Sequence, residues 1–449
     1  MRDLLENAAQ RAIGYLESLD ARGVAPAPGA VAALQQFERP LPDGPQPPAE
    51  TLRELDTLGS PATMAMAGGR FFGFVIGGAL PVTVASNWLT TAWDQNSAMD
   101  VVTPATSILE RVALRWMIEL FDLPEGTGGG FVTGATMANF TALAAARHEV
   151  LRRAGWNVEA EGLFGAPPIT VIIGDEAHPT LLKSLGMLGL GRSRVVRVPV
   201  DNQGRLRADK MPTMTGPTIV CAQAGNVNSC AFDPMAEIVS AASGHNAWVH
   251  VDGAFGLWAL ASPQLAHLAA NLNQADSWAT DAHKWLNVPY DGGVAFVRHA
   301  EALRAAMAIT AEYLPTAGAL RNPSDYTPEL SRRARGVDVW AALRTLGRSG
   351  IAQLIERCCA HARRFATELA AGGGTVHNDV VLNQVVVSFG DAARTRQVIA
   401  DIQTDGTLWC GPTVWQGHTA ARISVSSWAT TDDDVTRSIV AILRLCATR

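Results

Sequence analysis

The sequence predicts an α/β protein whose main sheet has much parallel pairing, followed by a smaller α+β lobe. Two observations predict this fold class. Between residues 169 and 253, short β-branched segments alternate with helix-like stretches, which is the order typical of parallel strands joined by helices. After about residue 336 the pattern changes to a long helical tract, two strand-like segments and a final helix, which indicates a separate lobe.

The N-terminal region, residues 1–70, is expected to form a helical and proline-rich arm. Its first 20 residues are amphipathic and of mixed charge, which predicts a helix. Residues 24–49 are rich in Pro, Ala and Gly, a composition that favours an extended connector over a packed helix.

Residues 71–335 are expected to form the large α/β domain. Apolar residues spaced three and four apart predict a helix from about Pro104, which the glycines at 128–130 end. Four buried strands are predicted, with a helix over 178–190 following the first; the strands are 169–174, 194–200, 218–224 and 247–253.

Residues 336–449 are expected to form the small α+β domain. The segments LNQVVVSFG and ARISVSSWA predict strands, and TTDDD predicts the start of the last helix, because Thr and Asp are favoured at helix N-termini.

Composition excludes several classes of function. The formal charge is −6 and no basic run is present, so no nucleic-acid partner is expected. The six cysteines form no CxxC pair and no metal-ligand spacing, so no metal is expected and reduced thiols in a cytoplasm are the default.

The N-terminus lacks the apolar core of a signal peptide, and the most apolar stretch, residues 71–85, is too short to span a membrane. No GxGxxG motif opens a strand–turn–helix unit, which argues against a dinucleotide-binding dehydrogenase.

Four features together indicate chemistry. Lys284 lies in an apolar neighbourhood, where desolvation favours the neutral amine that a Schiff base requires. Asp252 follows a strand, at the edge where α/β sheets bind ligands, and His178 follows another. Gly134, Ala135 and Thr136 open a helix whose N-terminus could hold an anion.

Each feature has an ordinary alternative: a surface lysine, a turn aspartate, a loop histidine and a capped helix. Their occurrence in this order within one α/β region favours a common site.

These residues resemble the pyridoxal 5′-phosphate (PLP)-dependent group II amino-acid decarboxylases, such as aromatic-L-amino-acid and glutamate decarboxylases. The likeness covers about residues 70–350, with a weaker echo in ARISVSSWATTDDDV, and Lys284 follows Asp252 by 32 positions, as in that family. The strings that carry it are VTGATMANFTALAAAR, GDEAHPTLLKSLGMLG, CAQAGNVNSCAFDP, HVDGAFG, DAHKWLNVPYDGG and SRRARGVDVWAALRTLG.

The resemblance implies the aspartate aminotransferase fold (fold type I), with a mixed, mostly parallel seven-stranded sheet. It also implies a role for each matching position. Lys284 would hold the cofactor as an aldimine, Asp252 would pair with the ring nitrogen, Ala254 would pack on the ring, and His178 would stack on the opposite face. The phosphate would be held by Gly134, Ala135, Thr136, Asp281 and His283. Gln223 stands where relatives often have Thr near the ring hydroxyl, and Ser331 lies in a segment that reaches the neighbouring subunit's cofactor.

In this family a loop tyrosine protonates the carbanion after carbon dioxide leaves, and relatives with Phe there tend to make aldehydes. Tyr326 is the candidate here, with Tyr313, or no tyrosine, as alternatives; Tyr326 could equally be a turn residue stacked on Pro328. Arg422 keeps transamination open, because aminotransferases of this fold grip the α-carboxylate with an arginine of the small lobe, although a salt bridge would also explain it.

The sequence therefore predicts a carboxy-lyase of amino-acid metabolism that converts an L-amino acid to its amine and carbon dioxide, with an aromatic substrate as one candidate. The alternatives are another fold-type-I enzyme (an aminotransferase, a C–C lyase or an aldehyde-forming oxidase) or a PLP-fold scaffold protein without catalysis. A cytoplasmic homodimer with active sites at the subunit interface is expected. Candidate lining residues, by resemblance, are Phe71, Phe72, Trp88, Trp93, Gln95 and Asn96.

Overall fold

The computed structural model describes residues 1–309 and 321–447, and its chain divides into two compact units. The larger unit comprises Ala79–Ala360 and Asn378–Gln384; the smaller comprises Met1–Gly78, His361–His377 and Val385–Arg449. The three-part division expected from the sequence, at residues 70 and 335, stays a prediction.

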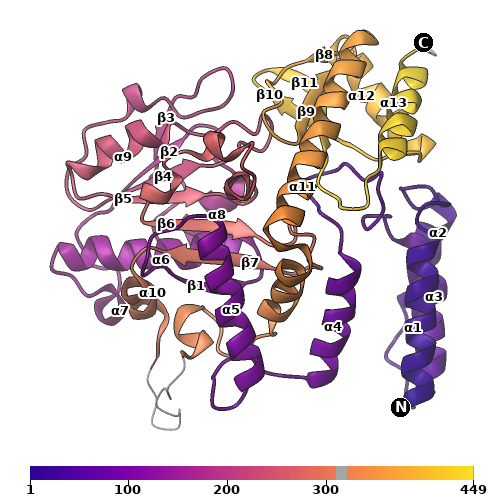
Figure 1. The fold of residues 1–449 in the computed structure, drawn as a ribbon, viewed down its shortest axis with the longest axis horizontal. Coiled ribbons are helices and arrows are strands. Elements are labelled where there is room, and N and C mark those ends of the chain that lie inside the picture. Colours follow the sequence, from indigo (N-terminus) through magenta and orange to yellow (C-terminus); the bar gives the residue numbers. More distant parts are fainter. Residues whose placement is uncertain (310–320, 448–449) are drawn as a thin grey trace. The chain divides into compact units, whose positions relative to one another are not determined.

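A seven-stranded sheet forms the centre of the large unit (Figure 1). The strand order is β1-β7-β6-β5-β4-β2-β3. Strands β3, β2, β4, β5 and β6 pair in parallel, and β7 is antiparallel to both β6 and β1. The mixed, mostly parallel sheet is therefore confirmed. The strands are β1 (Gly128–Val132), β2 (Thr170–Gly174), β3 (Val196–Val198), β4 (Thr218–Gln223), β5 (Trp248–Asp252), β6 (Ser277–Asp281) and β7 (Gly293–Val297).

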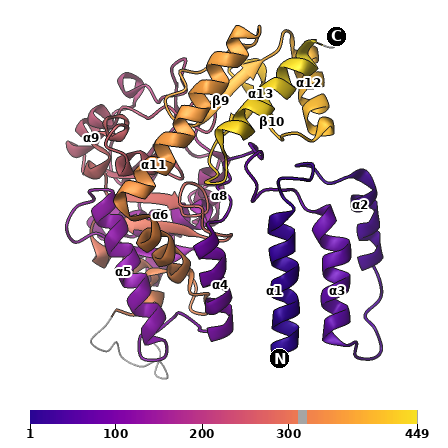
Figure 2. The ribbon, with the colours of Figure 1, turned by 45° about the vertical axis from the view of Figure 1, so that its right-hand side comes forward.

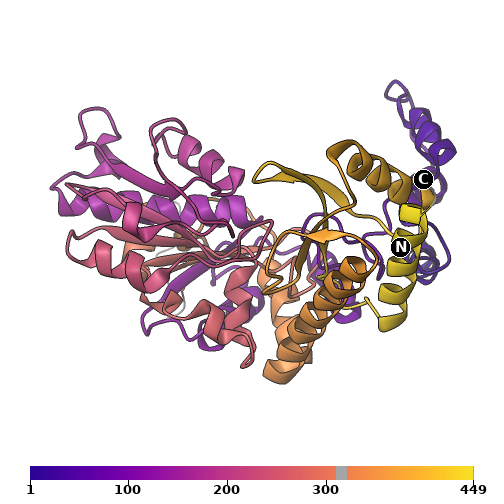
Figure 3. The same ribbon diagram turned by 90° about the horizontal axis from the view of Figure 1, so that it is seen from above.

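Helices pack along this sheet, as Figure 3 shows from above. The central one is α6 (Ala135–Arg153), which contacts β5, β6 and β7 and buries Leu143 together with four alanines, at positions 142 and 144–146. Because alanine adds little bulk, this helix can lie close to the strands and fill the core without voids. The other helices of the large unit are α4 (Pro81–Trp93), α5 (Pro104–Leu120), α7 (Val158–Glu161), α8 (Pro179–Met187), α9 (Met235–Ser243) and α10 (Ala300–Met307). Short 3₁₀ segments are η3 (Ala208–Lys210), η4 (Gly256–Ala261), η5 (Ala266–Ala269), η6 (Leu272–Gln274) and η7 (Pro323–Tyr326).

The small unit contains a four-stranded sheet in the order β10-β11-β9-β8. Its strands are β8 (Thr375–Val376), β9 (Gln384–Ser388), β10 (Gly411–Trp415) and β11 (His418–Ser424), and its C-terminal helices are α12 (Ala392–Asp405) and α13 (Asp432–Ala447). The two strands and the final helix predicted for this region are thus present. The helix α11 (Arg335–Ala371), interrupted at Gly347 with φ 59°, contributes residues to both units.

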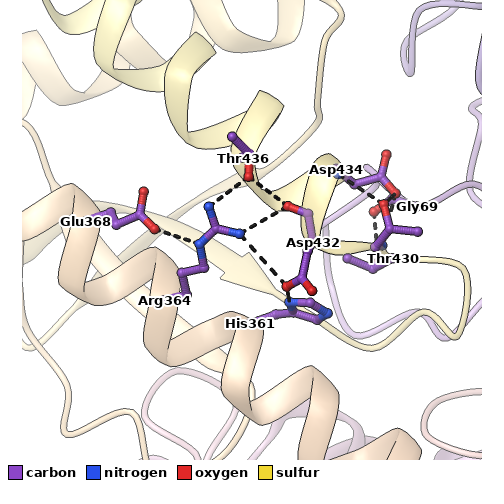
Figure 4. Close-up of polar contacts among 9 residues, drawn as sticks. Gly69, His361, Arg364, Glu368, Thr430, Asp432, Asp434 and Thr436 are labelled. Atoms are coloured by element: carbon purple, nitrogen blue, oxygen red, sulfur yellow. Dashed lines mark hydrogen bonds and ion pairs between the residues drawn. The ribbon is translucent and has the colours of Figure 1, made fainter.

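Polar contacts join α11 to the start of α13 within the small unit (Figure 4). The guanidinium of Arg364 donates to Glu368 Oε1 at 2.6 Å, to Thr436 Oγ1 at 2.7 Å and to the carbonyl of Asp432 at 3.0 Å. Beside them, Thr430 donates to the carbonyl of Gly69 at 2.8 Å. These bonds fix the first turn of α13, whose acidic residues suit a helix N-terminus.

The N-terminal helices also belong to the small unit, and α1 (Arg2–Glu17) and α3 (Pro48–Gly59) lie side by side (Figure 2). The extended connector expected over residues 24–49 is wrong in part, because α2 (Pro28–Ala33) and the 3₁₀ segments η1 (Leu34–Phe37) and η2 (Ser60–Ala62) form in and after it. The reason is that Pro28 occupies the first helical position, where its missing N–H costs nothing and its fixed φ favours the helix.

Among the described residues, no helix is long and apolar enough to cross a membrane.

Candidate active site

The predicted site residues lie at the carboxyl ends of four neighbouring parallel strands. Gln223 ends β4, Asp252 ends β5 and Asp281 ends β6, while His178 follows β2 by four residues. Since these strands are adjacent in the sheet, their ends open onto one crevice, which is where open α/β sheets bind ligands. Three of the predicted residues, His178, Gln223 and Asp252, line a common pocket.

Asp252 is a buried carboxyl, 5 % exposed, that forms no ion pair among the described residues. Burial raises its pKa, while the positive charges of His178 and Lys284 lower it. The backbone N–H of Ala254 donates to its Oδ1 at 3.3 Å. A buried acid of this kind needs a cationic partner in order to ionise, and a protonated ring nitrogen would supply one.

Lys284 follows β6 in a short turn and is partly buried. Its Nζ lies 2.7 Å from Asp281 Oδ2 and about 6.0 Å from the centre of the Phe255 ring. His283 Nε2 lies 3.5 Å from the same Asp281 oxygen. The other carboxylate oxygen, Asp281 Oδ1, is buried and accepts no hydrogen bond from the residues that the structure describes, so it is available to a ligand group that carries a hydrogen.

Gly134 caps the N-terminus of α6 and lies against the same residues. A Cβ at this position would lie 3.2 Å from His283 Cε1 and 3.5 Å from Asp281 Oδ1. Ala135 and Thr136 follow in the first turn, where backbone N–H groups have no partner within the helix. This first turn is therefore an open cradle of the kind that binds phosphate.

His178 caps α8 from its N-terminal side. Its Nδ1 lies 2.7 Å from Thr180 Oγ1 and accepts from the Thr180 backbone N–H at 3.3 Å. These bonds fix the orientation of the imidazole ring, which lines the pocket.

The remaining predicted residues fall into two groups. Gln223 lines the pocket, and its backbone N–H donates to Asp233 Oδ2 at 2.7 Å. Ala254 lies beside Asp252 and Asp281: its N–H donates to Asp252 Oδ1, and its carbonyl accepts from the Asp281 N–H at 3.1 Å. Tyr326 and Ser331 make no contact with Lys284 in the described part of the chain. The Tyr326 ring packs against the hydrophobic core beneath the Arg321 guanidinium, 3.6 Å from the ring centre, and Ser331 is exposed.

Other predicted positions lie elsewhere. The alternative Tyr313 lies outside the described residues. Arg422 is in β11 of the small unit, paired in register with Gly411. Of the candidate lining residues, Phe71 and Phe72 are buried in the small unit, whereas Trp88 and Trp93 are exposed on α4 of the large unit. Gln95 is exposed, and Asn96 Oδ1 accepts from the Arg332 backbone N–H at 3.0 Å.

Three residues near the site were not predicted. Tyr290 stacks on His283 with 4.2 Å between ring centres, and Asn139 and His250 lie in a buried polar cluster behind Asp252. A signal for His250 was present, because it precedes Asp252 by two positions in a strand and side chains at that spacing share a face. No sequence signal linked Asn139 to it, since the two are 111 positions apart.

The arrangement fits the cofactor that the resemblance implies. It offers a buried acid for the ring nitrogen, a glycine-lined helix N-terminus for the phosphate, an Asp281 oxygen that accepts no hydrogen bond from the described residues, and a lysine amine 2.7 Å from the other Asp281 oxygen.

Comparisons with known proteins agree with this site. A family model described as the pyridoxal-dependent decarboxylase conserved domain matches residues 35–388. Tryptophan decarboxylase 1 of Oryza sativa subsp. japonica is 27% identical over 469 residues, covering 95% of this chain and 90% of its own. Aromatic-L-amino-acid decarboxylase of Bacillus atrophaeus is 25% identical over 369 residues, covering 79% and 74%.

Solved structures share the fold. The crystal structure of Oryza sativa TDC with PLP and tryptamine has a TM-score of 0.91 at 23% identity, covering 99% of this chain and 97% of its own. The crystal structure of mouse CSAD has a TM-score of 0.92 at 19% identity, covering 100% and 99%. The predicted fold class is confirmed by these structures, and the predicted family by the sequence match.

Proposed function

Because the chain belongs to the pyridoxal-dependent decarboxylase family, and is thus a PLP-dependent amino-acid decarboxylase, we propose that Lys284, Asp252 and His178 are its catalytic residues. We further propose an L-amino acid with an aromatic side chain as its substrate. The observation that carries the assignment is the buried carboxyl of Asp252 at the end of β5, in one pocket with His178.

PLP, when bound, accepts the electron pair that the departing carboxylate leaves on Cα. The protein residues bind and orient. Asp252 would hold the ring-nitrogen end of the cofactor, and Lys284 would bind its aldehyde end through the side-chain amine. His178 and Ala254 would pack against the cofactor, and His178 would hydrogen-bond the substrate carboxylate and so orient the bond that is to be broken.

The phosphate end is assigned to the first turn of α6. Gly134, Ala135 and Thr136 would present backbone N–H groups and His283 would lie beside them, while Asp281 would accept a hydrogen bond from a protonated phosphate oxygen. Gln223 is assigned to the neighbourhood of the ring hydroxyl, and Ser331, which is exposed, to contact with a neighbouring subunit.

The aromatic substrate is supported by the names of the relatives, one a tryptophan decarboxylase and one an aromatic-L-amino-acid decarboxylase. A histidine decarboxylase of Drosophila melanogaster is 28% identical over 367 residues, so an imidazole side chain belongs in any substrate panel.

A second candidate function is the aldehyde-forming reaction. A phenylacetaldehyde synthase of Arabidopsis thaliana is 27% identical over 325 residues. One observation favours it: Tyr326, the proposed proton donor, already packs against the core beneath Arg321.

We also propose a cytoplasmic homodimer with active sites at the subunit interface. Neither α1 nor α3 has a buried residue, and large apolar side chains are exposed on both units. Apolar surface of this extent is typical of surfaces that a partner covers. The exposed side chains are Leu5, Ile13, Leu16 and Leu55 in the small unit and Trp88, Leu89, Trp93, Val101 and Val102 in the large unit.

The test is a panel of L-amino acids with detection of carbon dioxide, amine, aldehyde and oxo acid. Formation of carbon dioxide and amine from an aromatic substrate supports the proposal. The assignment of Lys284 is supported if Lys284→Ala forms neither product and if borohydride attaches the cofactor to Lys284 in the wild type. An oxo acid that forms only with a keto acceptor overturns it. Size-exclusion chromatography with light scattering tests the dimer.

A further inference from the structure

A chain of buried polar side chains lies directly behind Asp252. Trp248, His250 and Asp252 alternate along β5, so all three project from one face of the strand. Ser277 of β6 lies opposite His250 in the parallel register, and Asn139 of α6 covers the same face. Trp248, His250, Ser277 and Asn139 have no exposed surface.

Three hydrogen bonds connect this chain. Trp248 Nε1 donates to Ser277 Oγ at 2.8 Å, Ser277 Oγ lies 2.9 Å from His250 Nδ1, and His250 Nε2 lies 2.8 Å from Asn139 Oδ1. Burial lowers the pKa of His250 to about 3, so the imidazole is neutral and carries one hydrogen.

The partners determine where that hydrogen sits. An indole N–H can only donate, so Ser277 Oγ accepts from Trp248 and retains its own hydrogen for His250 Nδ1. The imidazole hydrogen is then on Nε2 and is donated to Asn139 Oδ1. If the imidazole hydrogen were on Nδ1 instead, the Ser277 hydrogen would have no acceptor and the Asn139 carbonyl would point toward the Asp252 carboxylate. Both changes are costly in a buried site.

The fixed amide leaves its nitrogen for the acid. Asn139 Nδ2 approaches the Asp252 carboxyl closely enough to lower its pKa, yet it makes no hydrogen bond of standard geometry with any described residue. The remaining donor to Asp252 is the Ala254 N–H at 3.3 Å. A buried carboxylate depends on such donors to stay ionised.

We propose that Asn139 is a positioning residue, held in one amide orientation by Trp248, Ser277 and His250, that keeps the Asp252 carboxylate charged and aimed at the cofactor's ring nitrogen. This inference rests on the proposed pairing of Asp252 with that nitrogen. It makes α6 hold both ends of the cofactor, because its first turn is the phosphate cradle and Asn139 lies one turn further on.

The test compares two cofactors on the full-length apoprotein: PLP, and the deaza analogue in which a C–H replaces the ring nitrogen. Asn139→Leu keeps the side-chain size but removes the donor. We expect it to weaken PLP binding about tenfold or more, as for a hydrogen bond to a charged group, and to leave binding of the analogue within about twofold. With ¹⁵N-labelled PLP, the ring-nitrogen resonance should move toward that of an unprotonated pyridine.

A matched control is Asn378→Leu. Asn378 is also a buried amide of the large unit, and it donates to the Gln384 carbonyl at 2.9 Å and to the Ser229 carbonyl at 3.4 Å. It should change the binding of the two cofactors equally and leave the resonance in place. If Asn139→Leu fails to fold, Ser277→Ala and Trp248→Phe are tested in its place. Each should weaken PLP binding about threefold more than binding of the analogue.

Two failures are distinguishable. Equal weakening of both cofactors by Asn139→Leu, or no weakening of either, would overturn the inference while Asp252→Asn still discriminates between the cofactors. If Asp252→Asn shows no discrimination, or the wild type does not bind PLP, the proposed function itself is wrong.

Discussion

Lys284 and Asp281, which are proposed to hold the cofactor's aldehyde and phosphate ends, form an ion pair with 2.7 Å between Nζ and Oδ2. The carboxylate is almost fully buried and the ammonium 18 % exposed. The Lys284 amine must leave this ion pair in order to react with a carbonyl group.

A double-mutant cycle should detect this pair. Asp281→Asn and Lys284→Met should each lower the free energy of unfolding of the apoprotein by about 1–3 kcal/mol, because each leaves a partly buried partner unpaired. The double variant should recover about 1 kcal/mol of the summed loss. Urea denaturation measures all four proteins, and strict additivity would show that the pair contributes nothing.

Gly134→Ala should weaken PLP binding about tenfold or more while hardly affecting pyridoxal, which lacks the phosphate. The added methyl group would lie 3.2 Å from His283 Cε1, inside the cradle. Cofactor titration by absorbance measures both. Gly29→Ala, where no atom lies within 4 Å of the new methyl, is the control, and an equal effect of Gly134→Ala on the two ligands would contradict the assignment.

The buried His250 predicts acid sensitivity. Its pKa is about 3 in the folded chain and about 6.5 when unfolded, so between these values only the unfolded chain binds the proton. Stability is therefore full above pH 6.5 and is lost as the pH falls, by about 2 kcal/mol between pH 7.5 and 5. His250→Gln should lack this component. Urea denaturation at the two pH values measures the free energy of unfolding of both proteins. If this free energy falls by the same amount in the wild type and in the variant, the prediction is refuted.

Arg332 and Glu110 form an ion pair at 2.9 Å with side chains 0% and 3% exposed. Arg332 also donates to the carbonyls of Phe131 and Ser97. Arg332→Met should cost about 3–5 kcal/mol of unfolding free energy because it leaves the carboxylate buried and unpaired. Adding Glu110→Leu should restore part of the loss. If the second substitution lowers stability further, the cost lies in the carbonyl contacts.

Tyr326→Phe tests the proposed proton donor. The ring that stacks with Arg321 at 3.6 Å is retained, so thermal unfolding should be unchanged while the product shifts from amine to aldehyde. Product analysis by mass spectrometry measures the ratio. If the variant still forms only amine, Tyr326 is not the proton donor, and Tyr313→Phe is the next substitution to test.

The parts of the fold that could be predicted are those with local signals. The buried strands β2, β4 and β5 were predicted because they are short, β-branched and bounded by turn residues, and α5 because of its spacing of apolar residues. The helix α2 was missed because proline-rich composition indicates extended chain, whereas Pro28 at a first helical position favours a helix.

The site residues follow the same pattern, because those with a local sequence signal were predicted and those without one were missed unless the family resemblance supplied them. Asp252 and His178 lie at or just after strands that the sequence predicts, and the end of a parallel strand is a position that sequence can identify. Asp281 was predicted from the family resemblance alone, because no strand was predicted before it. Asn139 lies inside an Ala-rich helix, where a polar residue carries no sign of its partner. Its link to His250 depends on how α6 crosses β5 and β6, which is a tertiary relationship. The stacking of Tyr290 on His283 is unreadable for the same reason.

The helix α6 also sets the spacing between the phosphate cradle and Asn139. Gly134 and Asn139 are five residues apart, a rise of about 7.5 Å along a helix axis. An inserted or deleted residue between them would turn Asn139 by about 100°, away from Asp252, while the cradle stayed in place. Loops around this crevice can therefore vary in length as the enzyme diverges or is engineered, but this one turn must keep its residue count.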